Sequence, residues 1–294
     1  MECPNQTTPN KFILSGFLYP EELKLPLLLF FSIVFVLTVS GNALIIGVMI
    51  SNLQLHKTMY WFLCHLSILD MAFSAVVVPK VILFCFHFIG CAECFLYTLM
   101  AYDCFLAICK PLFRNTLHYI NIMNQKACLF LSLGTLIGGS FNSAFLTSLN
   151  FHLPYGEDNY VDYVFCDIPA MLKLPCVDIQ FNELMSIIDV SFITMTCFLL
   201  ILASYAYILT AILKISSSEG WQRAFSTCTA HLTVVCIYYL PVFYHYMRLG
   251  SQDSVDSVVR VLYSTITPLL NPVIYTLRNK DIKTALVKLW GGNS

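Results

Sequence analysis

The sequence predicts an all-α membrane protein whose chain crosses the bilayer seven times. Of its 294 residues, 58% are hydrophobic and only 11% are charged, whereas soluble domains have about 45–50% apolar and about 25% charged residues. So little charge cannot cover a soluble surface, and the apolar residues form segments long enough to cross a bilayer as helices. The net charge of −1 also argues against nucleic-acid binding.

Seven apolar segments alternate with polar stretches along the chain. They are predicted to span the membrane at about 25–50, 59–81, 88–109, 127–147, 183–213, 223–247 and 257–277. Residues 1–24 form a tail in which Asn5 begins Asn-Gln-Thr, either an N-glycosylation acceptor or a chance triplet. Residues 278–294 form a second tail, whose RNKDIKTALVKLW stretch is predicted to lie on the membrane surface as a short amphipathic helix. The chain 1–294 is therefore predicted to be one domain.

The second and third spans are joined by an unusually short connection. From Met59 to Cys109 the chain is almost continuously apolar, with room for two spans of about 20 residues and about ten residues for a turn. We place this turn at about 82–87, after Pro79 and Lys80. The third helix is therefore expected to begin lower in the bundle than its neighbours.

The orientation follows from the distribution of lysine and arginine. The loops that contain Lys57, Lys110 and Lys214 carry about twice as many basic residues as the segments on the other side, where Lys11 and Lys173 lie. Basic loops face the cytoplasm. The amino terminus is therefore expected outside the cell and the carboxyl terminus inside.

Several strings resemble signatures of the olfactory receptors, a family of rhodopsin-like seven-helix G-protein-coupled receptors. They are MAYDCFLAICKPL at 100–112, KTMYWFL at 57–63, LSILD at 66–70, SSSEGWQRAFSTCTAHLTVV at 216–235 and PLLNPVIYTLRNK at 268–280. The resemblance covers nearly the whole chain and implies a plasma-membrane receptor. Such a receptor binds a small organic odorant and signals through a stimulatory heterotrimeric G protein. No phosphate loop, H-E-x-x-H motif or nucleophile elbow indicates an enzyme instead.

The chain departs from the family pattern in three places. The family writes MAYDRYVAICKPL where this chain has Cys104 and Phe105, and 113–117 reads as an insertion. The region between helices two and three is shorter than in the family by roughly 18 residues, about five helical turns. We therefore expect Asp189 and Ile193 to lose their opposing surface and the pocket to be more open.

Two other classes of function remain as alternatives. The first is a degenerate, receptor-like protein with little or no signalling, retained in the endoplasmic reticulum, because of Cys104 and the shortened region. The second is a transporter or channel, against which we find no internal repeat and no paired interrupted helices.

Two carboxylates, Asp70 and Glu93, lie inside predicted spans. Ionised groups in hydrocarbon are costly, so such residues are functional candidates. The resemblance places them with Asn271 around one polar site. Two close carboxylates cannot both ionise without a cation or a shared proton. The alternatives are a sodium site and a pair of protonated acids that hold helices together; apart from this sodium ion, no cofactor is expected.

The resemblance also implies roles in activation for several residues. Asp103 and position 104 belong to the G-protein-coupling motif, and Cys104 supplies one weak donor where the family's arginine has five donors and a permanent charge. Asn271 and Pro272, with Tyr275, resemble the family's activation hinge, although a passive proline kink is the alternative. Tyr205 resembles a tyrosine that turns inward on activation; otherwise it is an interfacial anchor.

The ligand pocket implied by the resemblance lies between the outer halves of helices three, five, six and seven. Ordinary core packing is the alternative for each residue. The candidates are Phe86, His87, Gly90, Asp189, Ile193, Tyr239, Val242, Phe243, Tyr246 and Ser264. Such a set is mainly apolar with a few polar groups, which suits a small organic molecule. In the loop before the fifth span, Cys166 and Cys176 match two family cysteines and either pair with each other or stay free.

Overall fold

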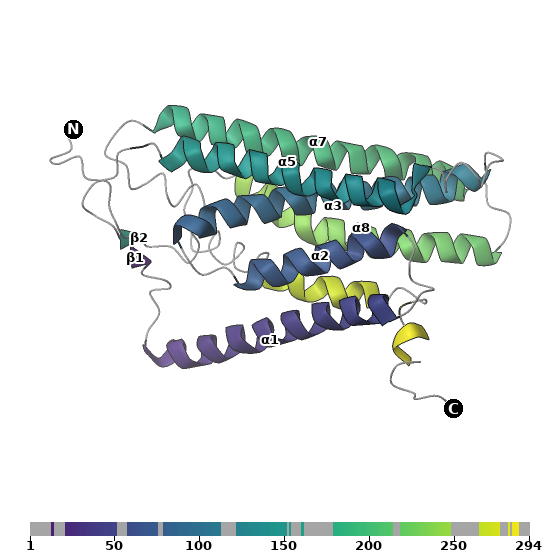
Figure 1. Ribbon diagram of the computed structural model, residues 1–294, viewed down its shortest axis with the longest axis horizontal. Coiled ribbons are helices and arrows are strands. Elements are labelled where there is room, and N and C mark those ends of the chain that lie inside the picture. Colours follow the sequence, from purple (N-terminus) through teal and green to yellow (C-terminus); the bar gives the residue numbers. More distant parts are fainter. Residues whose placement is uncertain are drawn as a thin grey trace.

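Helices account for nearly all of the computed structural model that is described (Figure 1). The described residues are 13–14, 21–51, 58–75, 79–112, 122–151, 153, 160–161, 179–213, 218–247, 265–276, 282 and 284–287. The long helices are α1 (Glu21–Ser51), α2 (Thr58–Ala75), α3 (Pro79–Leu112), α5 (Gln125–Phe151), α7 (Gln180–Ile212) and α8 (Ser218–Met247). A shorter helix covers 265–276. The prediction of a helical protein is confirmed for this part of the chain.

The described strands are a single short pair. β1 (Ile13–Leu14) and β2 (Tyr160–Val161) run parallel, with Ile13 opposite Tyr160. They lie beyond the end of the bundle at which α1 begins (Figure 1). This pair joins the segment before α1 to the segment between α5 and α7.

Four helices are long and apolar enough to cross a membrane by length and composition. The qualifying stretches are Leu29–Ser51, Phe84–Cys109, Gln125–Asn150 and Gln180–Ile212. Large apolar side chains project outward from them, for example Phe130 and Phe141 on α5 and Phe192 on α7. Outward-facing apolar side chains are what a lipid environment requires, because lipid tails are as apolar as these residues.

The predicted bounds of the second and third helices are wrong. The turn expected at about 82–87 lies inside α3, which begins at Pro79, and α2 ends at Ala75 instead of about 81. Proline is favoured in the first turn of a helix, where its missing N–H is not needed. The apolar run after Pro79 contains no residue that would stop the helix. The bounds of α1, α5 and α7 differ from the prediction by about one turn or less, and α8 begins five residues earlier than predicted. The predicted start of the last span lies outside the described residues.

The shortening therefore falls mainly on α2 and not on α3. α3 has 34 residues and is the longest helix described, whereas α2 has 18. α3 begins close to the level at which α5 ends, without projecting beyond it, while α2 ends further inside the bundle (Figure 1). The third helix was expected to begin lower in the bundle than its neighbours; relative to α2 this expectation is wrong, because α2 ends further inside the bundle than α3 begins (Figure 1).

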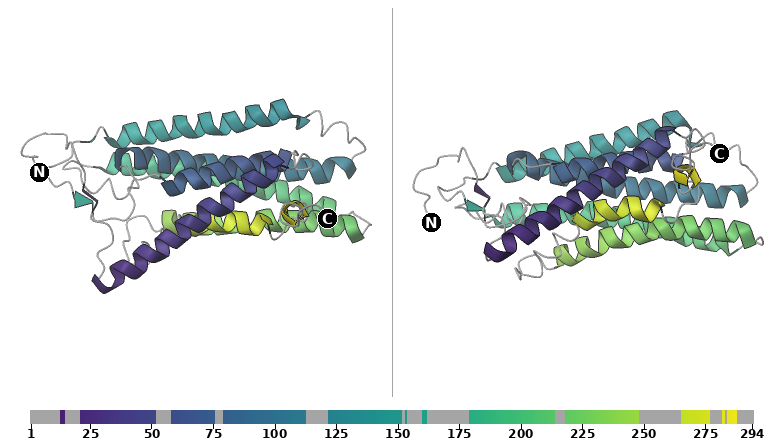
Figure 2. Two further views of the ribbon diagram at one scale, coloured as in Figure 1. Left: turned by 60° about the horizontal axis from the view of Figure 1, so that its bottom comes forward. Right: turned by 90° about the horizontal axis from the view of Figure 1, so that it is seen from below.

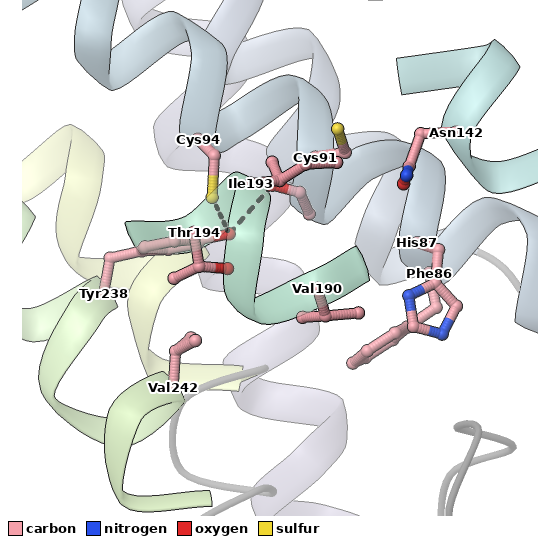
Figure 3. A pocket seen from close by; sticks show the side chains of 11 residues that line it. Phe86, His87, Cys91, Cys94, Asn142, Val190, Ile193, Thr194, Tyr238 and Val242 are labelled. Carbon is pink, nitrogen blue, oxygen red and sulfur yellow. Dashed lines mark hydrogen bonds between the residues drawn. The ribbon is translucent and has the colours of Figure 1, made fainter. Parts of the chain in front are cut away.

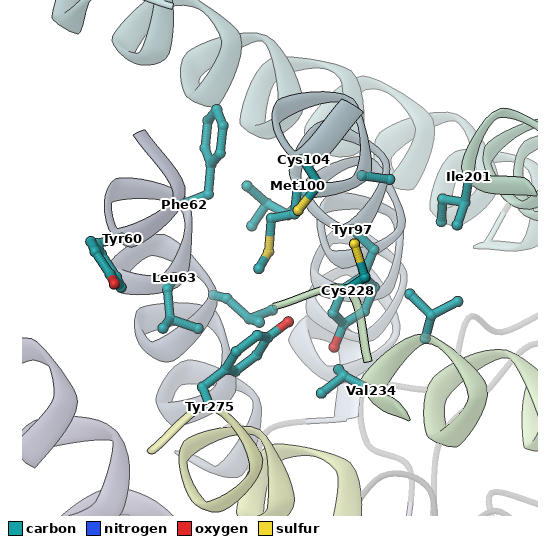
Figure 4. Packing of buried hydrophobic residues seen from close by; sticks show 14 of the residues in the cluster. Tyr60, Phe62, Leu63, Tyr97, Met100, Cys104, Ile201, Cys228, Val234 and Tyr275 are labelled. Atoms are coloured by element: carbon teal, nitrogen blue, oxygen red, sulfur yellow. The ribbon is translucent and has the colours of Figure 1, made fainter. Parts of the chain in front are cut away.

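α3 forms the centre of the bundle and contacts α2, α5, α7 and α8. Its buried face carries Leu96, Tyr97, Met100 and Cys104, which meet side chains from α2, α7, α8 and helix 265–276 (Figure 4). α5 approaches α3 closely because Gly139 has no side chain, and Ser143 Oγ donates a hydrogen bond to the Phe84 carbonyl. Small residues at such contacts are typical of membrane helices.

Polar side chains connect the outer helices. Asn42 Nδ2 of α1 donates to the Pro268 carbonyl at 3.1 Å, and Gly41 lets Pro272 pack against the same face. Between α5 and α7, Asn182 Nδ2 donates to the Leu149 carbonyl at 2.6 Å. α1 crosses the other helices obliquely (Figure 2) and also packs against α2. Interhelical hydrogen bonds of this kind contribute to membrane helix association.

Candidate functional site

A cavity between α3, α5, α7 and α8 contains half of the predicted ligand-binding residues. It encloses about 60 Å³ and is lined by Phe86, His87, Gly90, Cys91, Cys94, Asn142, Val190, Ile193, Thr194, Tyr238 and Val242 (Figure 3). Five of these were predicted: Phe86, His87, Gly90, Ile193 and Val242. The others follow the helix period, since Cys91 and Cys94 lie one turn from His87 and Gly90 on α3, and Val190 and Thr194 flank Ile193 on α7.

The remaining predicted pocket residues do not line this cavity. Tyr239 and Phe243 instead pack against Phe198, with ring centroids 5.2 and 5.0 Å from it. Such contacts place the two residues in an aromatic cluster beside the cavity. The side chain of Tyr246 and the whole of Ser264 lie outside the described residues.

Asp189 has a different setting from the one predicted. Asn142 Nδ2 of α5 donates to Asp189 Oδ2 at 2.7 Å, and Asp189 is not among the described residues that line the cavity. The expectation that Ile193 loses its opposing surface is wrong. Ile193 lines the cavity together with Phe86, His87 and Gly90 of α3, because α3 contains the turns from Pro79 onward.

Tyr238 connects α8 to α3 at the wall of this cavity. Its hydroxyl donates to the Gly90 carbonyl at 2.9 Å, and the Cys94 sulfur lies 3.3 Å from the same oxygen (Figure 3). A phenol has one hydrogen. Because that hydrogen is donated to Gly90, the Cys94 thiol is the donor in the second bond.

A smaller cavity lies deeper, beside helix 265–276. It encloses about 20 Å³ and is lined by Phe73, Phe86, Gly90, Glu93, Tyr238, Thr267 and Pro268. Glu93 is 7% exposed, and no described residue makes a hydrogen bond or ion pair with its carboxyl group. The buried Thr267 hydroxyl also has no hydrogen-bond partner among the described residues. The cavity therefore contains two polar groups whose hydrogen-bonding capacity is not used.

The central polar group predicted from the sequence is partly assembled. Asn271 Nδ2 lies 3.3 and 3.1 Å from the two carboxyl oxygens of Asp70 and 3.3 Å from the Tyr97 hydroxyl oxygen. All three residues are buried. Tyr97 was not predicted; it lies one turn after Glu93 on α3, so it shares a helix face with that residue. In the described part of the chain, no group of three or more His, Cys, Asp or Glu residues is placed to hold a metal ion.

The predicted coupling motif lies buried at the other end of α3. Cys104 is 4% exposed and packs in the core with Met100, Cys228 and Tyr275 (Figure 4). Asp103 is also buried and takes part in interactions within the structure. Asp103 therefore keeps interactions within the structure although Cys104 stands where the family has arginine.

Tyr205 of α7 is not at an interface with water or lipid. It is buried, and its hydroxyl lies 2.7 Å from His231 Nδ1 of α8, with the two rings stacked. Pro272 follows Asn271 within helix 265–276, and the Tyr275 ring is buried one turn later. Asn5, Cys166 and Cys176 lie outside the described residues.

A helical bundle with apolar outer faces defines the protein as a polytopic membrane protein. The family model described as olfactory receptor matches residues 31–291, so the chain belongs to the olfactory receptor family. The protein is thus a multi-pass plasma-membrane protein of the G-protein-coupled receptor class, with a role in olfaction. Its family is one of receptors and not of enzymes.

Curated relatives agree with this assignment. The chain is 51% identical to human olfactory receptor 10G6, over 99% of this chain and 92% of that protein. It is 44% identical to human olfactory receptor 10G7, over 98% and 97%, and 41% identical to mouse olfactory receptor 10D1B, over 96% and 95%. The alignment with 10G6 extends over 309 positions, more than the 294 residues of this chain. That relative therefore has residues at positions where this chain has none.

Proposed function

We propose that the protein binds a small organic odorant in the larger cavity and signals through a stimulatory heterotrimeric G protein. Its seven helices cross the plasma membrane, with the amino terminus outside. The carboxyl-terminal tail lies in the cytoplasm and carries a short amphipathic helix. Ile282, Ala285 and Leu286 of that tail are buried at helical spacing while Thr284 is exposed, which supports an amphipathic arrangement.

The cavity enclosed by four helices is the observation that carries this proposal. It is bordered by apolar side chains such as Phe86, Ile193 and Val242, together with a few polar groups. Ligand sites are typically concave and apolar with few polar groups. A volume of about 60 Å³ admits roughly four water-sized groups, so the ligand is small or the helices move slightly to admit it.

Filling the cavity is expected to abolish ligand binding. Ile193→Phe adds a ring where Ile193 faces α3, and we expect at least about 10-fold weaker binding of neutral odorants of about five to eight heavy atoms, with 1-pentanol as reference. Binding is measured by the ligand-induced rise in the thermal-unfolding midpoint of the chain in nanodiscs. Leu199→Phe on the exposed face of α7 is the matched control. If the two variants bind alike, the cavity is not the odorant site.

The buried thiol at position 104 favours a second candidate, a receptor-like protein with little or no signalling. G-protein coupling by this family is expected to use the arginine that Cys104 replaces. A chain of this kind binds the odorant without producing cyclic AMP, and it is retained in the endoplasmic reticulum. Ligand-evoked cyclic AMP, measured together with surface expression, separates the two candidates.

We also propose that Asp70, Glu93 and Asn271 bind a sodium ion. The contact between Asn271 and the Asp70 carboxyl group, together with the unmatched Glu93, supports this proposal. A hard monovalent cation would offset the charge of two carboxylates in a low-dielectric interior. Protonation of both acids is the alternative.

Asp70→Asn is expected to remove sodium sensitivity. A ligand that binds only the folded state raises stability, so sodium chloride is expected to raise the unfolding midpoint of the unmodified chain above that in choline chloride at the same ionic strength. The Asn variant keeps the shape of Asp70 but loses its charge, and its midpoint is expected to be the same in both salts. An unchanged sodium effect in this variant would favour the protonated pair.

A further inference from the structure

The two cavities described above have a common wall. Phe86, Gly90 and Tyr238 line both of them. Gly90 contributes no side chain, and a Cβ atom at this position would already lie 3.8 Å from the Tyr238 hydroxyl oxygen. Of the lining residues that the two cavities share, only Phe86 and Tyr238 have side chains. A ligand that occupies both cavities would have to displace one of these two side chains.

The deeper cavity contains acceptors without matching donors. Glu93 is more than nine-tenths buried, lines the cavity and has no hydrogen-bond or ion-pair partner among the described residues. The Thr267 hydroxyl, 3% exposed, is likewise unpartnered within the described part of the chain. Unmatched buried polar groups cost about 1–3 kcal/mol each, and more when charged. An occupant that donates hydrogen bonds would recover this free energy.

The charge of that occupant follows from the lining. None of the described residues that line either cavity is Lys or Arg, and His87 lines the larger cavity but not the deeper one, so the described lining of the deeper cavity offers no counter-charge to Glu93. The other two acids differ from Glu93, because Asp70 accepts a hydrogen bond from Asn271, Asp189 accepts one from Asn142, and neither lines either cavity. Glu93 is therefore the acid that can receive a cationic group from a ligand.

Size and hydrogen-bonding capacity both match an ammonium group. A volume of about 20 Å³ holds about one water-sized group, and a primary ammonium head is of that size. It carries three N–H donors, and the Glu93 carboxylate and Thr267 hydroxyl offer the acceptors. The larger cavity, bordered by Ile193 and Val242, then accepts a short aliphatic chain.

We infer that the ligand of this receptor is a small primary aliphatic amine, whose ammonium group binds Glu93 and Thr267 in the deeper cavity and whose chain fills the larger one. This inference rests on the proposed function and adds the chemical class of the odorant. The ammonium group occupies the position beside Glu93 that the proposed sodium ion takes in the unliganded receptor. Binding of the amine and binding of sodium are therefore mutually exclusive.

The test compares pentylamine with 1-pentanol, which has the same number of heavy atoms but no charge. Dissociation constants are obtained from ligand-induced shifts of the unfolding midpoint in nanodiscs. Hydrogen bonds to charged groups exceed neutral ones by about 1 kcal/mol or more, so pentylamine is expected to bind at least about 5-fold more tightly. Glu93→Gln, which keeps the shape but not the charge, is expected to reduce pentylamine binding to the level of 1-pentanol. It should leave 1-pentanol binding unchanged.

Two further variants keep the test decisive. Asp189→Asn is the matched acid-to-amide control and is expected to retain the preference for the amine. Thr267→Val keeps nearly the same shape but lacks the hydroxyl. It is expected to weaken pentylamine binding several-fold without changing 1-pentanol binding, and it takes the place of Glu93→Gln in the test if that variant does not fold.

Equal binding of both probes to the unmodified chain overturns the inference and leaves the proposed function intact. A preference lost in Asp189→Asn but kept in Glu93→Gln also overturns it. Binding of neither probe counts against both proposals.

Discussion

Replacing Gly139 with valine is expected to lower the yield of folded protein several-fold. A Cβ atom at position 139 would lie 3.0 Å from the Phe88 carbonyl oxygen and 3.4 Å from the Ala92 backbone nitrogen. These are backbone atoms of α3, so the contact cannot be relieved by a side-chain rotation. Forcing extra methyl groups into a packed contact costs about 1–3 kcal/mol and sometimes more. Total stabilities are about 5–15 kcal/mol, and α3 is the helix on which the rest of the bundle packs.

The same α5 helix provides the control. Gly134 is exposed, and a Cβ atom there would meet nothing within 4 Å, so Gly134→Val should be close to neutral. The folded fraction is measured by fluorescence-detected size-exclusion chromatography of detergent extracts, and the unfolding midpoint in the same extracts. Equal behaviour of the two variants would show that the close approach of α3 and α5 is not required.

If the second candidate holds, the receptor-like protein with little or no signalling, the unmodified chain and Cys104→Arg are both expected to give little surface expression and little cyclic AMP. Restoring the arginine returns the charge and donors of the family motif, but Cys104 lies in a packed core, and a guanidinium there must displace its neighbours. The resemblance also implies a disulfide bridge from the outer end of helix three to the external loop, and its helix-three cysteine falls in the segment by which this chain is shorter than the family. Losing a native disulfide typically costs about 2–5 kcal/mol, and losses of 1–2 kcal/mol already change abundance several-fold in cells.

A graft separates the two defects. Inserting a family-type segment with its cysteine between α2 and α3 is expected to restore surface expression several-fold. The graft combined with Cys104→Arg is expected to restore ligand-evoked cyclic AMP as well, whereas the graft alone should reach the surface without signalling. Surface antibody staining and a cyclic-AMP reporter are read from the same cells. Robust cyclic AMP from the unmodified chain would show that neither change is needed.

The family and the helical class were predictable because they depend on local features of the sequence. Apolar segments and the strings around Asp103, His231 and Asn271 are visible without a structure. The contact between Asp70 and Asn271 was likewise predicted by resemblance, and the structure contains it. Such features are predictable despite the shortened region between helices two and three, because each depends on residues within one helix or on two sequence motifs.

The location of the turn and the environment of Asp189 were not predictable. The stretch from Met59 to Cys109 is so uniformly apolar that hydropathy does not place a boundary within it; Pro79 determines where α3 begins. Asp189 pairs with Asn142, a residue 47 positions away, and such a contact depends on how two helices are rotated. Cys91, Cys94 and Thr194 line the cavity but were not predicted. In the sequence, only their helical spacing from predicted residues points to them.

The two hydrogen bonds at the Tyr238 hydroxyl oxygen also affect how often α8 moves away from α3. Both bonds, to the Gly90 carbonyl and from the Cys94 thiol, join α8 to α3, so a displacement of α8 away from α3 breaks them together. Two such bonds contribute roughly 1–2 kcal/mol net, a factor of about 5–30 in an equilibrium. Spontaneous displacements of α8 away from α3 are therefore rarer by that factor. Any ligand-independent receptor activity that needs such a displacement is lowered accordingly.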